Sequence, residues 1–214
     1  MRVELPRLLS VLSHELRSPV SVLQGYIRLM QRQRAAGPPD EALLTAMLDA
    51  TGRIAALGRQ ATDLSRWLSP REHVALRTIT LATLVSDVSA RLDAAHGSAI
   101  LTAGSADATL QTLDPALLAV SLATLAESHY RDLGNSPVLA TFSADAIDVR
   151  IRMAPASDPP AHEISASGPV VFDRGGLGLG LAVSSYVLDA HAAQVHAAGS
   201  SIMDVQFPRE RGAA

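Results

Sequence analysis

Residues 13–19 read Ser-His-Glu-Leu-Arg-Ser-Pro and bring a histidine, a carboxylate and a hydroxyl together in a short segment. A neutral imidazole is a nucleophile, and a neighbouring carboxylate can orient one ring nitrogen while the other attacks. Ser18 follows His14 by four residues, so both side chains share one face if the segment is helical. The segment predicts nucleophilic chemistry at His14 with Glu15 beside it. The competing hypothesis is an ordinary surface histidine on a helix.

The apolar residues around His14 predict the helix that carries it. Eight of them recur at helical spacing and share one stripe about 100° wide. They are Leu5, Leu8, Leu9, Leu12, Leu16, Leu23, Ile27 and Met30. Measured from Leu12 at the centre of the stripe, His14 points about 200° away, towards solvent. Pro19 lies on the stripe and predicts a kink, because proline removes one hydrogen bond to the preceding turn.

A second helix is predicted between the break at residues 35–40 and Leu68. Its apolar residues alternate at spacings of three and four, as in a coiled-coil seam. They are Met47, Ala50, Ile54, Leu57, Ala61, Leu64 and Leu68. Two such helices joined by a short loop form an antiparallel hairpin, and one hairpin cannot cover both apolar stripes. We therefore expect a homodimer in which two hairpins form a four-helix bundle.

Beyond residue 72 the pattern changes to alternating helices and strands, which predicts an α+β domain over residues 73–214. The expected helices span residues 81–95, 114–130 and 181–192, and the expected strands span residues 99–102, 138–142, 147–153, 194–197 and 201–207. Asp114 is the expected N-cap of the second of these helices, with Pro115 in its first turn.

Residues 13–20, Ser-His-Glu-Leu-Arg-Ser-Pro-Val, closely resemble the H-box of bacterial two-component sensor histidine kinases, whose usual form is SHELRTPL. Residues 53–54 and 63–66 are similar to the closing part of the same dimerisation and phosphotransfer hairpin. The resemblance implies a dimerisation and phosphotransfer hairpin over residues 1–72, with a response-regulator receiver domain as partner.

The same resemblance implies a role for each polar residue of the motif. His14 is expected to be the phosphoacceptor and Glu15 its acid/base partner. Arg17 is expected to stabilise phosphoryl oxygens through its planar fork of donors. Ser18 takes the place of a threonine that, in the family, helps to position water for dephosphorylating the receiver domain.

Residues 172–183, Phe-Asp-Arg-Gly-Gly-Leu-Gly-Leu-Gly-Leu-Ala-Val, are similar to the glycine-rich G2 box of the kinases' ATPase domain. Glycines there let backbone N–H groups approach phosphates at a helix N-terminus. The resemblance implies cofactor contacts at Gly176, Gly178 and Gly180. It also implies that residues 73–214 form an α/β sandwich like the histidine kinase ATP-binding domain.

Other positions depart from the family pattern. Thr124 and Ser128 stand where the N-box has two asparagines, one of which binds Mg²⁺. Pro155 replaces the aspartate that reads adenine, and Ser157 and Pro159 replace two glycines. We therefore expect impaired ATP use, with ATP and Mg²⁺ as cofactors only if the altered pocket still binds nucleotide. Nearby Glu127 and His129 are expected to be ordinary surface residues, as are the remaining histidines.

Composition excludes several classes of function. The charges are balanced, with 18 basic against 21 acidic residues, so we expect no nucleic-acid partner. The absence of cysteine excludes disulfides and thiolate chemistry, and no histidine spacing indicates a metal site. The longest nearly apolar run, residues 115–126, is too short to cross a bilayer. The sequence thus predicts a cytoplasmic protein without direct membrane insertion.

Three functional hypotheses follow. The first is a phosphotransferase or phosphatase that exchanges a phosphoryl group between His14 and receiver aspartates. The second is an ATP-dependent histidine kinase with a divergent nucleotide pocket. The third is a non-catalytic module that binds a response regulator.

Overall fold

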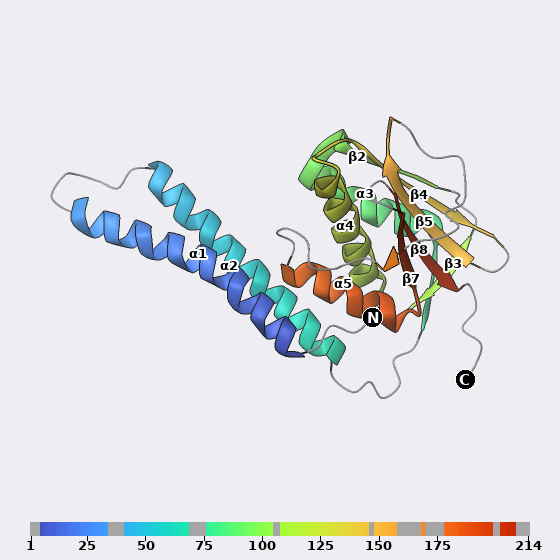
Figure 1. The fold of residues 1–214 in the computed structure, drawn as a ribbon, viewed down its shortest axis with the longest axis horizontal. Coiled ribbons are helices and arrows are strands. Elements are labelled where there is room, and N and C mark those ends of the chain that lie inside the picture. Colours follow the sequence, from blue (N-terminus) through green and yellow to red (C-terminus); the bar gives the residue numbers. More distant parts are fainter. Residues whose placement is uncertain are drawn as a thin grey trace. The chain divides into compact units, whose positions relative to one another are not determined.

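The computed structural model contains two compact units, Val3–Ser69 and Pro70–Ala214 (Figure 1). The residues that it describes are 5–33, 41–68, 76–104, 108–145, 148–157, 168–169, 178–198 and 202–208. The break expected at residues 35–40 lies outside these ranges, as do His73, His162 and Pro159.

Two long helices, α1 (Leu5–Gln33) and α2 (Glu41–Leu68), pack against each other in the N-terminal unit and form the predicted hairpin. Every second member of the α2 stripe, which recurs at a spacing of seven, is buried. These residues are Ala50, Leu57 and Leu64. Their burial confirms the helical phase that the sequence predicted for α2, because the same phase aligns all three with α1.

The apolar stripe of α1 is only partly covered. Leu8 and Pro19 are buried, whereas Leu9 and Ile27 are exposed. These two residues lie at the edge of the predicted stripe, and a single neighbouring helix covers only a narrow seam. The helix itself continues through Pro19.

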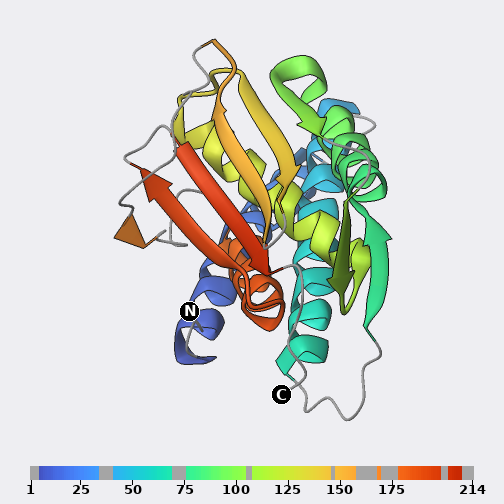
Figure 2. The same ribbon diagram turned by 90° about the vertical axis from the view of Figure 1, so that its right-hand side faces the viewer.

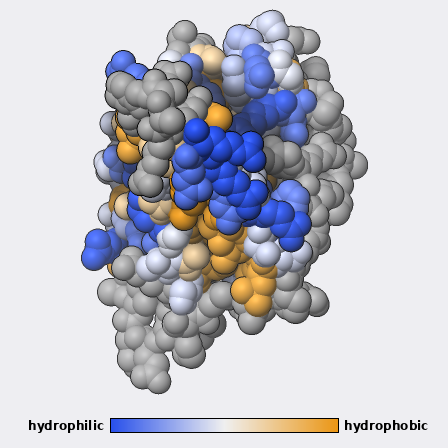
Figure 3. Space-filling model, turned by 90° about the vertical axis from the view of Figure 1, so that its left-hand side faces the viewer, coloured by the Kyte–Doolittle hydropathy of each residue, from blue (hydrophilic) through white to orange (hydrophobic). Residues whose placement is uncertain are grey.

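Large apolar side chains of the hairpin remain in contact with solvent. Among the described residues they are Leu9, Val20, Val22, Ile27, Leu29, Leu44 and Leu48. Leu48 is the most exposed, at 73%. Figure 3 shows apolar side chains lying together on the face that it draws. Apolar surface that is contiguous, and not scattered, is typical of a surface that another chain covers.

The C-terminal unit alternates helices and strands as predicted. Its described elements are β1 (Arg77–Thr80), α3 (Leu81–His96), the short 3₁₀ turn η1 (Gly97–Ala99), β2 (Ile100–Gly104), β3 (Thr109–Thr112), α4 (Pro115–Asp132), β4 (Val138–Ala144), β5 (Asp148–Pro155), β6 (Gly168–Pro169), α5 (Gly178–Ala190), β7 (Gln194–Ala198) and β8 (Ile202–Pro208). The sequence did not predict β1, β3 or β6, because strands of two to four residues are too short to show a clear alternation.

The strands form one mixed sheet and one small ladder. The six-stranded sheet has the order β2-β4-β5-β8-β7-β6, in which β2 and β4 are parallel and the other neighbours antiparallel. Strands β1 and β3 pair antiparallel in a separate ladder. Figure 2 shows α3, α4 and α5 on one face of the large sheet. This two-layer arrangement confirms the expected α/β sandwich.

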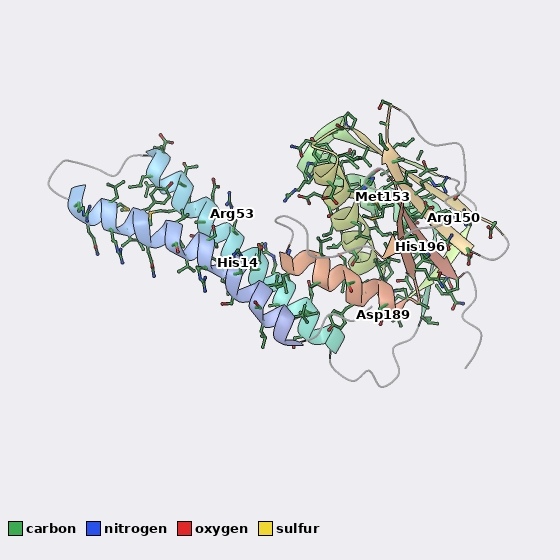
Figure 4. The ribbon with its side chains drawn as sticks, in the orientation of Figure 1. His14, Arg53, Arg150, Met153, Asp189 and His196 are labelled. Atoms are coloured by element: carbon green, nitrogen blue, oxygen red, sulfur yellow. The ribbon has the colours of Figure 1, made fainter. Side chains whose placement is uncertain are left out.

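Alternation along β5 explains why the helices cover only one face. Val149, Ile151 and Met153 are buried, while Arg150 and Arg152 between them are half-buried on the opposite face. Successive side chains of a strand point to opposite faces, so the apolar set packs under the helices. Figure 4 labels Arg150 and Met153 on this strand.

The start of α4 is fixed by its cap. The backbone N–H of Leu117 donates to Asp114 Oδ1 at 3.0 Å, and Pro115 occupies the first turn. Both features confirm the prediction from the sequence. They could be predicted because a helix cap depends only on residues next to one another in the chain. No helix in the described parts of the chain is both long enough and apolar enough to cross a membrane.

Candidate functional site

The motif around His14 lies in the first half of α1. His14, Arg17 and Ser18 are exposed, and Glu15 is half-buried. Figure 4 labels His14 on this helix. Because His14 and Ser18 are four residues apart, they lie one turn apart on the same face. A second protein can therefore reach the imidazole and the hydroxyl together.

The opposite side of the same segment anchors the helix. Leu12 and Leu16 are half-buried, and Pro19 is buried. Proline has no backbone N–H, so the carbonyl of Glu15 has no donor at its usual helical position. The backbone next to His14 therefore lacks one helical hydrogen bond within an otherwise regular helix.

An open hollow of about 500 Å³ lies further along α1. Its described lining residues are Val22, Gly25, Tyr26, Arg28, Leu29 and Arg32. Val22 and Leu29 follow Ser18 by four and eleven residues, so the hollow continues on the side of the helix that carries Ser18. Gly25 has no atom within 4 Å of where a Cβ would stand, and its missing side chain deepens the hollow.

The glycine-rich segment leads into α5. Gly178 is the first residue of this helix, and Gly180 is buried in its first turn. Gly176 lies outside the described residues. The predicted helix after the glycines is therefore present, and its first N–H groups have no partner within the helix. The role of the three glycines in binding a cofactor stays a prediction.

The substituted nucleotide positions lie on α4 and at the end of β5. The hydroxyl of Thr124 donates to the backbone carbonyl of Val120 at 2.9 Å, so it is tied to its own helix. Ser128 is buried one turn later. Pro155 is the last residue of β5 and pairs with Val138 of β4.

The prediction that His129 is a surface residue was wrong, because its side chain is only 3% exposed. Leu122, Leu125, Ala126 and His129 follow one another at the spacing of a single helix face, and all four are buried. This spacing indicated in the sequence that position 129 is buried. It was overlooked because histidine is a polar residue.

Glu127 is half-buried and takes part in a charged cluster at the outer side of α4. One of its carboxylate oxygens, Oε1, pairs with Arg131 and lies 3.6 Å from His96 Nε2. The ring of His96 also packs against Tyr130, with a centroid distance of 5.2 Å. These contacts give Glu127 a structural partner on α3. Within the described residues, no three histidine or acidic side chains are grouped to hold a metal ion.

Residues 5–70 match the sequence family of the His Kinase A (phospho-acceptor) domain. The matched range contains both helices of the hairpin and the whole motif around His14.

Three solved structures share the fold of most of the chain. The Acinetobacter baumannii histidine kinase AdeS has 18% sequence identity and a TM-score of 0.67, covering 92% of this chain and 98% of its own. Histidine kinase ThkA, solved in complex with the response regulator protein TrrA, has 15% identity and a TM-score of 0.64, covering 92% of this chain. Full-length ShkA in complex with AMPPNP has 22% identity and a TM-score of 0.57, covering 99%.

This chain spans 60% of the ThkA chain and 47% of the ShkA chain. At these identities the structural similarity concerns the fold. The phospho-acceptor family match over the hairpin supplies the relationship in sequence. Residues 5–70 are therefore matched by the His Kinase A (phospho-acceptor) domain, and most of the chain shares the fold of solved histidine kinases.

Proposed function

We propose that this protein exchanges a phosphoryl group between His14 and an aspartate of a response-regulator receiver domain, acting as a phosphotransferase or phosphatase with impaired use of ATP. The observation that carries the proposal is the exposed face of α1 on which His14 and Ser18 lie one turn apart. A phosphoryl donor that belongs to another protein requires an acceptor exposed on the surface of this one, because the reacting atoms must approach to about 3–3.5 Å.

In the transfer step, a ring nitrogen of His14 attacks the phosphorus of an aspartyl phosphate. The N–P bond forms as the acyl P–O bond breaks, and the aspartate leaves as a carboxylate. The proton on the other ring nitrogen is then available to a base, and the adjacent carboxylate of Glu15 is the expected one. Arg17 is exposed and lies three residues from His14, and its guanidinium is the proposed partner of the phosphoryl oxygens.

Dephosphorylation of the receiver requires a water molecule in line with the phosphorus. The exposed hydroxyl of Ser18 can accept and donate hydrogen bonds, so it suits the role of holding that water. His14 and Ser18 would thus serve two separate reactions on one face of α1.

The surface around the motif supports a protein partner. The hollow lined by Val22, Tyr26 and Leu29 offers apolar contact, with Arg28 and Arg32 at its border. A receiver domain seated there would lie on the side of α1 that carries Ser18. The further exposed apolar side chains, such as Leu44 and Leu48 of α2, support the homodimeric four-helix bundle.

Three substitutions support impaired use of ATP. Mg²⁺ prefers near-octahedral oxygen ligands, and the Thr124 hydroxyl is short and tied to the carbonyl of Val120. Ser128 is buried and also shorter than asparagine. Pro155 has no side-chain acceptor for an adenine amino group. In the proposed transfer, therefore, the phosphoryl group does not come from ATP bound to this chain, and the receiver domain supplies the Mg²⁺.

The test compares two phosphoryl donors on the full chain. A receiver domain charged with radiolabelled acetyl phosphate is expected to label the wild-type chain and to leave His14→Ala unlabelled. Radiolabelled ATP is expected to leave both unlabelled over the same time. His196→Ala is the matched control, because His196 lies on the sheet of the other unit and should not affect labelling (Figure 4).

Each alternative has its own result. Strong labelling by ATP that disappears in His14→Ala would establish the ATP-dependent kinase and overturn impaired use of ATP. Stable receiver binding without label on His14 from either donor would leave only the non-catalytic module. A direct ATP-binding titration separates a pocket that binds nucleotide without reacting from one that does not bind.

A further inference from the structure

His191 follows α5 directly, and its side chain is 5% exposed, so the expectation of an ordinary surface histidine was wrong here too. Both ring nitrogens have partners. Nε2 lies 3.0 Å from the backbone N of Leu113 and 2.9 Å from Thr112 Oγ1. Nδ1 lies 2.6 Å from the backbone carbonyl of Val187. One buried ring therefore contacts two segments that are far apart in the sequence.

These partners determine the protonation state of the ring. The backbone N–H of Leu113 can only donate, so Nε2 must accept and carries no proton. The carbonyl of Val187 can only accept, so Nδ1 carries the proton and donates. His191 is therefore a neutral imidazole protonated at Nδ1, and the Thr112 hydroxyl is left to act as a second donor to Nε2.

The ring joins the end of α5 to the start of α4. Thr112 ends β3, and Leu113 immediately precedes Asp114, the N-cap of α4. Val187 lies in the last turn of α5. His191 thus links the two helices that carry the substituted nucleotide positions and the buried Gly180.

Protonation at Nε2 would break this link. It would place two N–H donors at the 3.0 Å separation of Nε2 and the N of Leu113, and no acceptor would remain between them. The charged residues nearest these contacts along the described elements are Asp114 beside Leu113, Asp189 on α5 and Arg77, which pairs with Thr112 across the β1–β3 ladder, whereas Glu127, Arg131 and Asp132 lie in the last turns of α4. The carboxylates favour protonation of the ring, and the guanidinium opposes it.

We propose that His191 is an acid-sensitive latch, whose neutral ring pins the last turn of α5 to the β3–α4 connection and whose protonation releases it. The latch is independent of phosphoryl transfer at His14, so neither proposal depends on the other. Its release would change the spacing between α4 and α5 without any ligand.

The test measures unfolding of the full chain against pH for the wild type and His191→Gln. Glutamine keeps an acceptor for Leu113 N–H but does not titrate. The unfolded imidazole takes up a proton near pH 6.5 and the folded ring resists it, so stability is complete above that pH and falls below it. The folding equilibrium constant of the wild type should fall about tenfold per pH unit below pH 6.5 relative to the variant.

Two controls isolate the ring. Thr112→Val removes one hydrogen bond and should retain the pH dependence. Asp114→Asn removes the carboxylate next to Leu113, and it should also retain the pH dependence, because the dependence arises from the ring of His191. Parallel pH profiles for wild type and His191→Gln would overturn the proposal.

A measurement on the wild type avoids any failure of the variant to fold. Nitrogen-15 NMR of the imidazole ring should report a neutral, Nδ1-protonated His191 at pH 7, and the Leu113 amide should exchange slowly with solvent. Acidification should lower the protection factor of that amide, which is the ratio of its intrinsic to its observed exchange rate, before global unfolding. A ring protonated at Nε2 at pH 7, or a Leu113 amide that stays protected until the whole unit unfolds, would contradict the latch.

Discussion

The two units of this protein differ in the solvent exposure of their histidines and neighbouring polar residues. The hairpin exposes His14, Arg17 and Ser18 along one helix, whereas the C-terminal unit buries His129 of α4 and His191 at the end of α5. An exposed site needs only the phase of one helix, because its partner comes from outside. A buried polar residue needs partners from elsewhere in the chain, because an unpaired polar group in the interior costs about 1–3 kcal/mol.

The same contrast separates the motifs. The residues around His14 keep the pattern of a phospho-acceptor domain, and residues 5–70 match that family. The C-terminal unit has the expected fold. Thr124, Ser128 and Pro155, however, stand where the family resemblance leads us to expect residues that contact the nucleotide and its metal ion. A fold can persist after its ligand-binding residues change, since the apolar core determines the fold and the polar residues determine the site.

The largest predicted effect is on the exposed site. His14→Ala should abolish phosphoryl acceptance from a receiver domain and leave thermal unfolding unchanged, because an exposed imidazole contributes little to packing. Phosphate incorporation and circular dichroism measure the two properties. Residual labelling above background would identify another acceptor and would contradict the view that the exposed His14 of the hairpin is the site of labelling.

The largest predicted effect on stability is in the other unit. Phe142 is almost completely buried in β4, so Phe142→Ala should destabilise the C-terminal unit by about 3–5 kcal/mol. Urea denaturation monitored for each unit is expected to show a loss restricted to this one. Thr141→Ala, on the exposed face of the same strand, is the control and should have a small effect. Equal losses at both positions would contradict a one-sided core.

Ser18→Ala should separate two reactions at the exposed site. We expect receiver dephosphorylation to slow on the order of a hundredfold, because a positioned hydroxyl no longer orients water. Labelling of His14 should change much less. Time courses of phosphate release and of His14 labelling provide the comparison. If both rates fall equally, Ser18 has only a structural role.

A smaller effect is expected at the start of α4. Asp114→Ala should reduce the stability of the C-terminal unit by about 1 kcal/mol, because the N–H of Leu117 loses its capping acceptor. Asp114→Ser, which can still cap the helix, should recover most of the loss. Chemical denaturation of both variants tests this, and equal destabilisation by both would rule out capping as the cause.

The smallest predicted effect is the change in stability when a glycine is replaced by alanine, and its sign differs between the two units. Gly52 lies within α2 and has no atom within 4 Å of the place that a methyl group would take, so Gly52→Ala should stabilise the hairpin by about 0.5–1 kcal/mol. Gly97 has a φ of +57°, which disfavours a side chain, so Gly97→Ala should destabilise the C-terminal unit. Thermal unfolding of both variants measures the signs. Destabilisation by Gly52→Ala would indicate close packing against another chain at that position.

Much of the fold followed from local patterns. The periodicity of α1 and α2, the cap at Asp114 and the longer strands were all predicted correctly, because each depends on neighbouring residues in the sequence. The short ladder between β1 and β3 was missed, since four-residue strands are defined mainly by their pairing. The exposure of Leu9 and Ile27 was also missed, because the width of a buried seam depends on how many helices cover it.

The sequence by itself determined the chemistry of the candidate site, because residues spaced by four on one helix share a face whatever surrounds them. It placed His14, Arg17 and Ser18 together before any tertiary contact was known. Only the tertiary structure decided the state of His191, whose partners Thr112 and Leu113 are more than seventy residues away. Long-range hydrogen bonds leave no periodic signal, so the protonation of that ring became evident only from the folded chain.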